Sequence, residues 1–200
     1  MMKTLRLLFV ISGVFFLITA CEENLEPIIE DSLTDLGLQA KTAKLVKKPL
    51  KAMLSTGQAD DALTQLCSFT SETDFWGLEH QIGGGNSTLL GDFTTDITMC
   101  FHIVLNEQGP DLQNGFGEFN EVEGSMIAAN GDKIYFVTPG SKLEFIQDDI
   151  YNFKFIDYCT IVGGAGRFEN ATGEFVSKGM VRIDGTGIDH HWEGTVILNK

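Results

Sequence analysis

A cluster of carboxylates and imidazoles at Asp189–Glu193, with His190 and His191 as neighbours, is the densest set of ionisable side chains in the sequence. Zinc accepts imidazole and carboxylate ligands. Neighbouring residues of a strand point to opposite faces, so the two histidines cannot bind one metal ion without a bulge. Pairing His190 with Asp189 or with His80 also reproduces no known zinc-ligand spacing. We therefore predict no metal site and interpret the segment as a solvated turn.

Serines and glycines give no support for a hydrolase or for a phosphate-binding loop. Ser125, Ser141 and Ser177 lack the Gly-x-Ser-x-Gly setting of a hydrolase nucleophile. The stretch Gly163–Gly166 is glycine-rich, but a strand pattern follows it. A phosphate-binding loop needs a following helix and a basic or hydroxyl partner. We therefore predict no catalytic residue and no cofactor.

Three polar residues that share the phase of apolar neighbours in strand-like segments are the candidates for ligand binding. They are Glu118, Asn120 and Asp157. If their faces point inward, they form a pocket with a few polar groups in an apolar wall, which is typical of small-molecule sites. A β-bulge that reverses the phase, or pairing with Arg167 or Arg182, explains the pattern without a ligand. We favour this second explanation, because an unpaired buried charge is costly.

The cysteines are Cys21, Cys67, Cys100 and Cys159. No Cys-x-x-Cys spacing exists, which argues against structural zinc and thioredoxin-type chemistry. Cys159 shares the phase of apolar core residues, Cys100 lies in the opposite phase to its apolar neighbours, and Cys67 lies in a predicted loop. We favour a Cys67–Cys100 disulfide, with burial as small apolar groups as the alternative.

The N-terminal segment has the layout of a bacterial lipoprotein signal. Two basic residues precede an apolar run at residues 7–17, which is too short for a membrane-spanning helix. Ile18–Cys21 then reads Ile-Thr-Ala-Cys, so small residues precede a thiol that can accept diacylglycerol. We predict a signal peptide at residues 1–20 and lipidation of Cys21. The acidic pair that follows resembles the export signal of surface lipoproteins.

Residues 21–46 are interpreted as an acidic tether and residues 47–200 as the folded domain. Removal of residues 1–20 takes away Lys3 and Arg6 and no acidic residue, so the net charge changes from −14 to −16. Such a surface repels the phosphates of nucleic acids and of anionic lipids, so we expect no nucleic-acid partner and attachment to the membrane through the lipid. We predict a place in the cell envelope, at the outer membrane on its periplasmic or surface face.

Polar and apolar residues alternate with a period of two over most of the folded domain, which predicts strands. The expected strands span residues 49–56, 75–82, 93–105, 116–128, 133–138, 151–161, 175–183 and 192–198. Turn signals occur at Gly83–Asn86, Gln108–Pro110, Asn130–Asp132 and Pro139–Gly140. About eight strands with one apolar face predict an antiparallel all-β domain, either a closed eight-stranded barrel or a two-sheet sandwich.

The stretch Gly163–Phe175 resembles the glycine signature of the allene oxide cyclase-like and dirigent-like β-barrels. The residues that carry the signature are Gly163, Gly164, Gly166, Phe168 and Gly173. Gly85–Asp92 and Ala128–Asp132 are similar to stretches of secreted bacterial barrels of this type. The resemblance implies an eight-stranded barrel. Glycines permit positive φ and close backbone approach, and Phe168 is expected to plug the barrel.

The resemblance implies an architecture and no activity, because no active-site residue of either family can be placed on this sequence. We expect a non-catalytic binding or interaction module for a small apolar ligand or an envelope protein. An isomerase or cyclase that acts inside the barrel is the alternative. A sealed core would favour interaction through the loops, whereas an open cavity would permit chemistry. The oligomeric state stays open.

Overall fold

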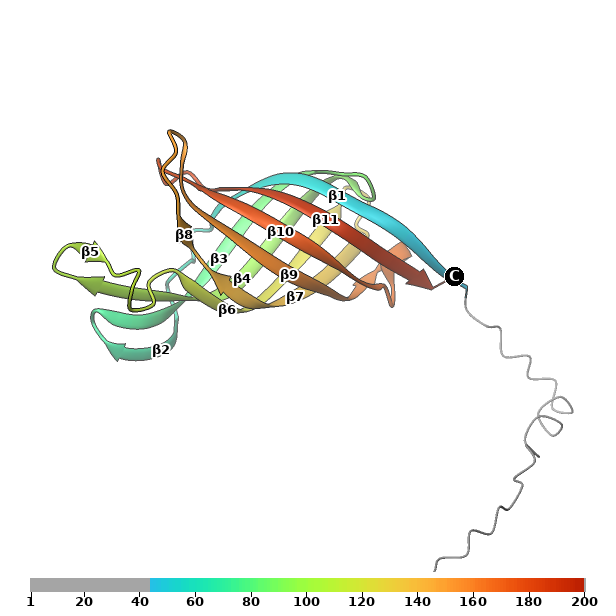
Figure 1. Ribbon diagram of the computed structural model, residues 1–200. Coiled ribbons are helices and arrows are strands. Elements are labelled where there is room, and N and C mark those ends of the chain that lie inside the picture. The colour runs from blue at the N-terminus through green and yellow to red at the C-terminus, as the bar shows by residue number, and fades with distance from the viewer. Residues whose placement is uncertain (1–43, 200) are drawn as a thin grey trace, which may run out of the picture. The chain divides into compact units, whose positions relative to one another are not determined.

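The segments with period-two alternation form the wall of a closed barrel in the computed structural model, which describes residues 44–199. Eight antiparallel strands each pair with the next strand of the wall, and the last pairs with the first (Figure 1). They are β1 (Leu45–Gln58), β3 (Asp74–Ser87), β4 (Gly91–Asn106), β6 (Glu118–Ala128), β7 (Lys133–Lys142), β9 (Tyr151–Ala165), β10 (Thr172–Arg182) and β11 (Ile188–Asn199). The predicted all-β fold is confirmed, with the barrel and not the sandwich. The predicted signal peptide, Cys21 and nearly all of the tether lie outside the described residues.

Short strands and one 3-10 turn lie at the two ends of the barrel. The strands β2 (Leu66–Ser71), β5 (Gly109–Pro110) and β8 (Glu144–Phe145) pair with β3, β4 and β9, respectively. Figure 1 shows all three at the end opposite the C-terminus, which we call the open end. A 3-10 turn, η2 (Gly166–Phe168), follows β9 at the other end, which we call the closed end. Within residues 44–199, no helix is long and apolar enough to cross a bilayer.

Large apolar side chains fill the barrel next to the closed end. The largest fully buried ones are Trp192, Phe168, Leu50, Met126, Ile134, Ile161 and Val196. Trp192 packs against Phe136 and Phe175, with ring centroids 5.4 and 5.1 Å apart. An eight-stranded barrel has an interior that side chains can fill, and this half of the barrel is filled in that way.

A β-bulge in β6 reverses the phase of that strand. Glu121 has a φ of +53°, and the register changes from Thr98 opposite Glu123 to Cys100 opposite Asn120. Two residues of β6 therefore oppose one residue of β4, so the buried positions change from odd to even numbers along the strand. Glu118 is exposed and Asn120 is half-buried. The inward placement considered for Glu118 and Asn120 is thus not observed, and the bulge is the physical reason.

Two predicted turns lie inside strands. Gly83–Asn86 belongs to β3, where a Cβ on Gly83 or Gly85 would overlap backbone atoms of β1. Pro139–Gly140 belongs to β7, where a Cβ on Gly140 would overlap the backbone of β6. Glycine serves the close approach of neighbouring strands at these positions. Asn130–Asp132 does form a turn, and it connects β6 to β7.

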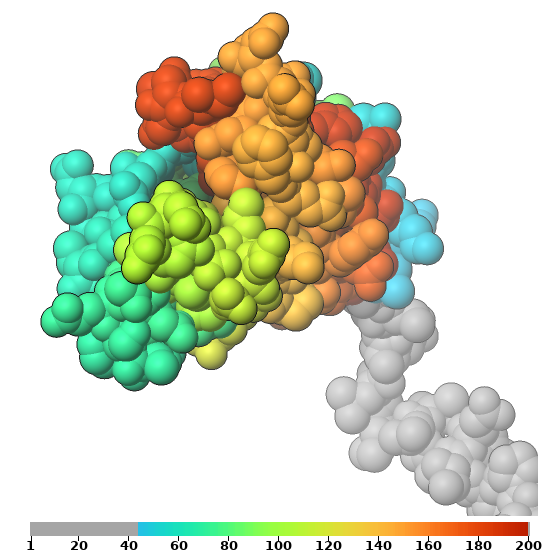
Figure 2. Space-filling model, turned by 60° about the vertical axis from the view of Figure 1, so that its left-hand side comes forward, coloured from blue at the N-terminus to red at the C-terminus, as the bar shows by residue number. Residues whose placement is uncertain are grey.

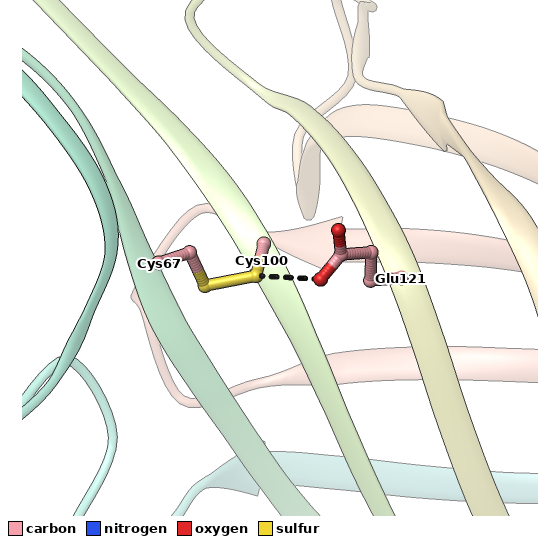
Figure 3. The surroundings of a disulfide bond; sticks show 3 residues. All are labelled: Cys67, Cys100 and Glu121. Carbon is pink, nitrogen blue, oxygen red and sulfur yellow. Dashed lines mark hydrogen bonds between the residues drawn. A yellow bond between two sulfur atoms is a disulfide. The ribbon is translucent and has the colours of Figure 1, made fainter.

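A disulfide joins Cys67 of β2 to Cys100 on the outer face of β4 (Figure 3). Cys67 therefore lies in a short strand and not in the predicted loop. Glu121 Oε2 lies 3.6 Å from Cys100 Sγ, beside the bulge. Cys159 is a free, buried thiol on the inner face of β9, as its phase suggested. The cross-link therefore ties β2 to the outside of the barrel wall and leaves the interior thiol unpaired.

Candidate functional site

A cavity of about 390 Å³ occupies the barrel interior between the packed half and the open end. Its wall includes Gly185 and Gly187 of the β10–β11 turn and Leu63 of the β1–β2 connection, so it extends to the open end. Figure 2, which brings the open end forward, shows a hollow between teal residues after β1, the red β10–β11 turn and orange residues around β8. The interior is therefore sealed at one end and hollow at the other.

Most polar side chains of the cavity wall lie on one set of neighbouring strands. Five neighbouring strands supply every polar side chain of the wall except Thr138. This polar wall consists of Glu79 and Gln81 on β3, Thr56 and Gln58 on β1, His190 and Trp192 on β11, Ser177 on β10, and Asp157 and Cys159 on β9. The apolar wall opposite consists of Ile97, Met99, Phe101 and Ile103 on β4, Phe119 and Val122 on β6, and Phe136 on β7. The cavity thus has hydrocarbon on one side and most of its hydrogen-bonding groups on the other, where Phe155, Val181 and Ile188 add apolar contacts.

A hydrogen-bonded chain crosses three strands of the polar wall. Thr56 Oγ1 donates to Gln81 Oε1 over 2.8 Å and lies 3.0 Å from His190 Nε2. A hydroxyl carries one proton, so Thr56 accepts from His190, which assigns the imidazole proton to Nε2. His190 Nδ1 then is a buried acceptor without a partner. Burial lowers the pKa of His190 to about 4, so the ring is neutral at pH 7.

Asp157 is the most perturbed carboxyl of the cavity. It is 6% exposed, its Oδ1 atom has no hydrogen-bond partner, and no ion pair within residues 44–199 includes it. Burial raises the pKa of Asp157 to about 7. The same burial, with the neighbouring Asp157 charge, raises the pKa of the Cys159 thiol. Asp157 therefore titrates near neutral pH, whereas Cys159 stays protonated.

Glu79 is the second carboxyl of the wall. Gln58 Nε2 donates to Glu79 Oε2 over 3.0 Å. Burial raises the pKa of Glu79, and the hydrogen bonds from Gln58 and Gln81 partly offset this rise. Unlike Asp157, this carboxyl is held by a neighbouring amide.

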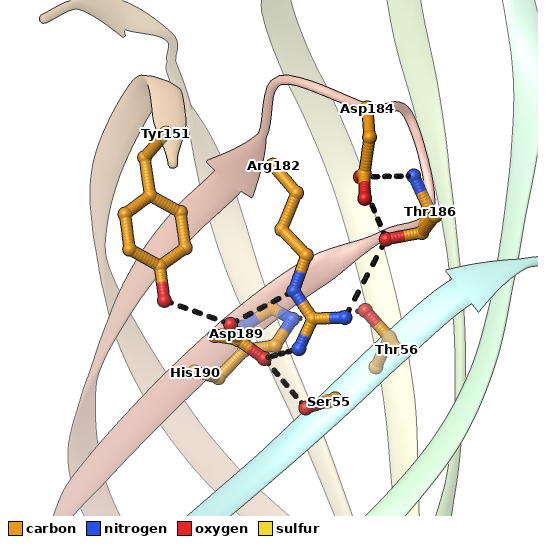
Figure 4. Close-up of polar contacts among 8 residues, drawn as sticks. All are labelled: Ser55, Thr56, Tyr151, Arg182, Asp184, Thr186, Asp189 and His190. Atoms are coloured by element: carbon orange, nitrogen blue, oxygen red, sulfur yellow. Dashed lines mark hydrogen bonds and ion pairs between the residues drawn. The ribbon is translucent and has the colours of Figure 1, made fainter. Parts of the chain in front are cut away.

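An ion-pair network braces the outer face of the barrel at the open end (Figure 4). Asp189 accepts hydrogen bonds from Arg182 Nε and Nη2, over 3.0 and 2.6 Å, from the Tyr151 hydroxyl over 2.9 Å and from Ser55 Oγ over 2.6 Å. The bonds from Arg182 are the main reason why the pKa of Asp189 is lowered to about 2. The network joins β9, β10, β11 and β1 next to His190, and so positions that part of the polar wall.

The interpretation of Asp189–Glu193 as a solvated turn is wrong, because the segment lies inside β11. Its alternation places His190 in the interior and His191 on the surface, as expected for neighbouring residues of a strand. Within residues 44–199, no group of three or more His, Cys, Asp or Glu side chains is arranged to hold a metal ion.

The glycine signature lies at the closed end. Gly163, Gly166 and Gly173 have φ values of +151°, +66° and +137°. A Cβ on Gly164 would overlap the Lys133 carbonyl oxygen. Phe168 is fully buried, and Arg167 stacks over its ring at 4.7 Å while it pairs with Asp132 over 3.0 Å. The signature residues therefore seal the barrel and do not border the cavity.

Of the three polar residues considered as candidates for a ligand pocket, the structure places Asp157 in the cavity wall and places Glu118 and Asn120 outside it. Neither arginine considered as a partner for Asp157 reaches it, because Arg167 and Arg182 pair with Asp132 and Asp189.

Sequence reasoning missed the polar residues of β1 and β3 and the role of His190. His190 shares the phase of Trp192, which is a signal that could have placed it inside. In β3 the apolar residues Leu78 and Ile82 lie in the outer phase, while Glu79 and Gln81 are buried in the inner phase, so alternation alone pointed the wrong way.

Comparisons with protein-family models, with curated proteins and with solved structures found no match to this chain. The geometry of the cavity and the sequence patterns therefore carry the functional argument.

Proposed function

We propose that the protein is a lipid-anchored component of the bacterial cell envelope whose barrel binds a small, largely apolar ligand. The observation that carries the binding role is the cavity of about 390 Å³, which combines one polar and one apolar wall. Small-molecule sites have volumes of about 300–1,000 Å³, apolar walls and a few polar groups that orient the ligand. Side chains fill the other half of the same barrel, so an eight-stranded barrel of this size does not have to contain a cavity.

The binding proposal is tested with a neutral, apolar fluorescent probe, N-phenyl-1-naphthylamine, whose emission rises in apolar surroundings. Ser177→Leu places extra hydrocarbon in the cavity wall, and we expect it to weaken probe binding by about tenfold or more, which is about 1.4 kcal/mol. Val176→Leu is the matched control, because Val176 is the adjacent residue of β10 in the outward phase. Equal probe affinities in the wild type and both variants would contradict binding in the cavity.

The proposed location at the membrane rests on Cys21 and the residues before it. A diacylglycerol-modified cysteine anchors a protein stably, whereas a single acyl chain binds only reversibly. Mass spectrometry of the membrane fraction should find Cys21 as an acylated N-terminus. An intact residue 1, or an unmodified Cys21, would refute the anchor without affecting the proposed cavity ligand.

We also propose kinship with the allene oxide cyclase-like and dirigent-like barrels. The support is the glycine signature at Gly163–Phe175 together with an eight-stranded antiparallel barrel. A shared fold carries no activity with it, so the kinship adds nothing to the choice of ligand.

An isomerase that moves a proton inside the cavity is the second candidate function. The observation that favours it is Asp157, a buried carboxyl whose pKa of about 7 suits a general base near neutral pH. An identified ligand incubated with the protein in D₂O should then exchange a carbon-bound hydrogen, and Asp157→Asn should abolish the exchange. Binding without any exchange would leave the protein a carrier.

A further inference from the structure

The carboxyls of the cavity wall have no basic side chain to neutralise them. Among the residues of 44–199 that line the cavity, Asp157 and Glu79 carry carboxyl groups and none is Lys or Arg. Arg182, at the open end of β10, is held on the outer face by Asp189. An anionic ligand would therefore enter a cavity without a counter-ion.

Asp157 is a buried carboxyl group that, within residues 44–199, lacks a hydrogen-bond donor or a cation beside it. Its side chain is more than nine-tenths buried, lines the cavity and has an oxygen without a hydrogen bond. The neighbouring inner position on β10 is Ser177, which makes no hydrogen bond to it. Glu79, by contrast, accepts a hydrogen bond from Gln58. A buried carboxyl without a donor is costly, and a donor that arrives with the ligand removes that cost.

Aromatic rings lie around the same position. Phe155 shares the inner face of β9 with Asp157, and its ring packs edge-to-face on Phe119 with the centroids 5.3 Å apart. Trp192 lies opposite Ser177 on the adjacent strand. The attraction between a cation and an aromatic ring is strongest where water is excluded, as in this cavity wall.

We infer that the ligand of the cavity is an apolar amine, whose ammonium group pairs with the Asp157 carboxylate and whose hydrocarbon lies on the apolar wall of β4, β6 and β7. This inference rests on the proposed binding function and names its ligand class. A fatty acid of the same size would bring a second negative charge to the wall. A neutral alcohol would make a hydrogen bond but no ion pair.

Ion pairing makes amine binding depend on pH. The titratable groups that face the cavity are Glu79 on β3, Asp157 and Cys159 on β9, and His190 on β11, whereas the lining residues of β4, β6, β7 and β10 are not ionisable. His190 is neutral above about pH 4 and Cys159 stays protonated, so the two carboxyls are the groups that change charge at higher pH. Burial raises the pKa of Asp157 to about 7, and it also raises the pKa of Glu79, which the Gln58 amide partly offsets. A paired cation lowers a carboxyl pKa by about 1–3 units, so amine affinity should rise about tenfold or more through the pH range in which Asp157 ionises.

The test compares octylamine, octanol and octanoate, which share one chain and differ in the head group, as competitors of N-phenyl-1-naphthylamine on the full protein. At pH 8.5 we expect octylamine to bind about tenfold tighter than octanol, and octanoate to bind most weakly. At pH 5.5 the advantage of octylamine should disappear. An alkylamine keeps its proton across this range, because its pKa is about 10.

Asp157→Asn should reduce octylamine affinity to that of octanol at pH 8.5 and leave octanol binding unchanged. The control Glu174→Gln removes a charge from the exposed face of β10 and should preserve the preference for the amine. Equal affinities for the three compounds, tighter binding of octanoate, or an unchanged amine preference in Asp157→Asn would overturn the inference while leaving the cavity-binding proposal intact. Failure of the probe and of all three compounds to bind would instead refute the proposed function.

Discussion

The Cys67–Cys100 disulfide should contribute a large share of the stability of the barrel. The two cysteines are 33 residues apart in sequence, and the bridge closes a loop that contains nearly all of β2, all of β3 and most of β4. The chain-entropy relation gives about 3.7 kcal/mol at 25 °C for a loop of this length. Folded domains are stable by only about 5–15 kcal/mol, so this contribution is substantial.

The perturbation is the double variant Cys67→Ala, Cys100→Ala, compared with the wild type in urea unfolding followed by tryptophan fluorescence. We expect a loss of about 3–4 kcal/mol, and a decrease in Tm of about 10 °C for a domain of this size. Reductant should destabilise the wild type to a similar extent and leave the double variant unchanged. Cys159→Ala is the matched control, because this thiol is free and buried, so that variant should keep its sensitivity to reductant.

The reasoning fails if the double variant is as stable as the wild type to within about 0.5 kcal/mol, which is the usual scatter of such differences. It also fails if peptide mapping places Cys159 in a disulfide, because the bridge would then lie inside the barrel and the face assignments of β4 and β9 would be wrong.

Three further predictions concern the closed end and the cavity. Phe168→Ala should destabilise the protein by about 3–5 kcal/mol in urea unfolding, because its ring is fully buried at the closed end, whereas Tyr158→Ala, at a residue 72% exposed, should change stability by less than about 0.5 kcal/mol. Gly166→Val should lower Tm, since a left-handed backbone at φ +66° costs a residue with a β-carbon about 1–2 kcal/mol, and added ATP should not raise the Tm of the wild type if the loop is structural. Asp157→Asn should stabilise the ligand-free protein at pH 8 by up to about 4 kcal/mol and have little effect at pH 4, because a folded-state pKa raised from 3.8 to about 7 destabilises the fold progressively as pH rises between these values. A constant difference between Asp157→Asn and the wild type from pH 4 to pH 8 would show that Asp157 is not a buried, titrating carboxyl.

Alternation in the sequence predicted the barrel because most inward positions are apolar. In β9 the buried residues Phe155, Asp157, Cys159 and Ile161 keep one phase, so both the strand and the inward Asp157 were predictable. A bulge in β6 could be suggested from the sequence but not located. A glycine often marks such a position, whereas here Glu121 adopts the positive φ. Bulges of this kind depend on the partner strand as well as on the local sequence.

Most residues of the polar wall could not be predicted from the sequence, for a different reason. In β3 the outer residue Trp76 stacks on His102, with ring centroids 4.4 Å apart, beside the disulfide-linked β2. These apolar outer residues reverse the usual meaning of alternation. β2 pairs with β3 only at Asp74–Gly77, and Ile82 further along the same outer face is 48% exposed. The inner face of β3 becomes buried when the barrel closes through the pairing of β1 with β11, which are distant in sequence, so no local pattern reports it. Glu79 and Gln81 therefore looked like surface residues until the barrel closed around them.

One half of the interior is packed with apolar side chains, whereas the other contains polar atoms without hydrogen-bond partners. This contrast is the main argument for a ligand. Next to the closed end, the chain fills the barrel with Leu50, Met126 and Ile134, all fully buried. Around the cavity it leaves unpartnered atoms on Asp157, on His190 and on Trp192, whose ring also packs against the filled half. Each buried polar group without a hydrogen bond costs about 1–3 kcal/mol, so three of them oppose folding by an amount comparable with the total stability of a domain. A ligand that supplies the missing partners would recover that free energy on binding. The polar wall then lowers the stability of the empty barrel and raises its affinity for the ligand through the same atoms.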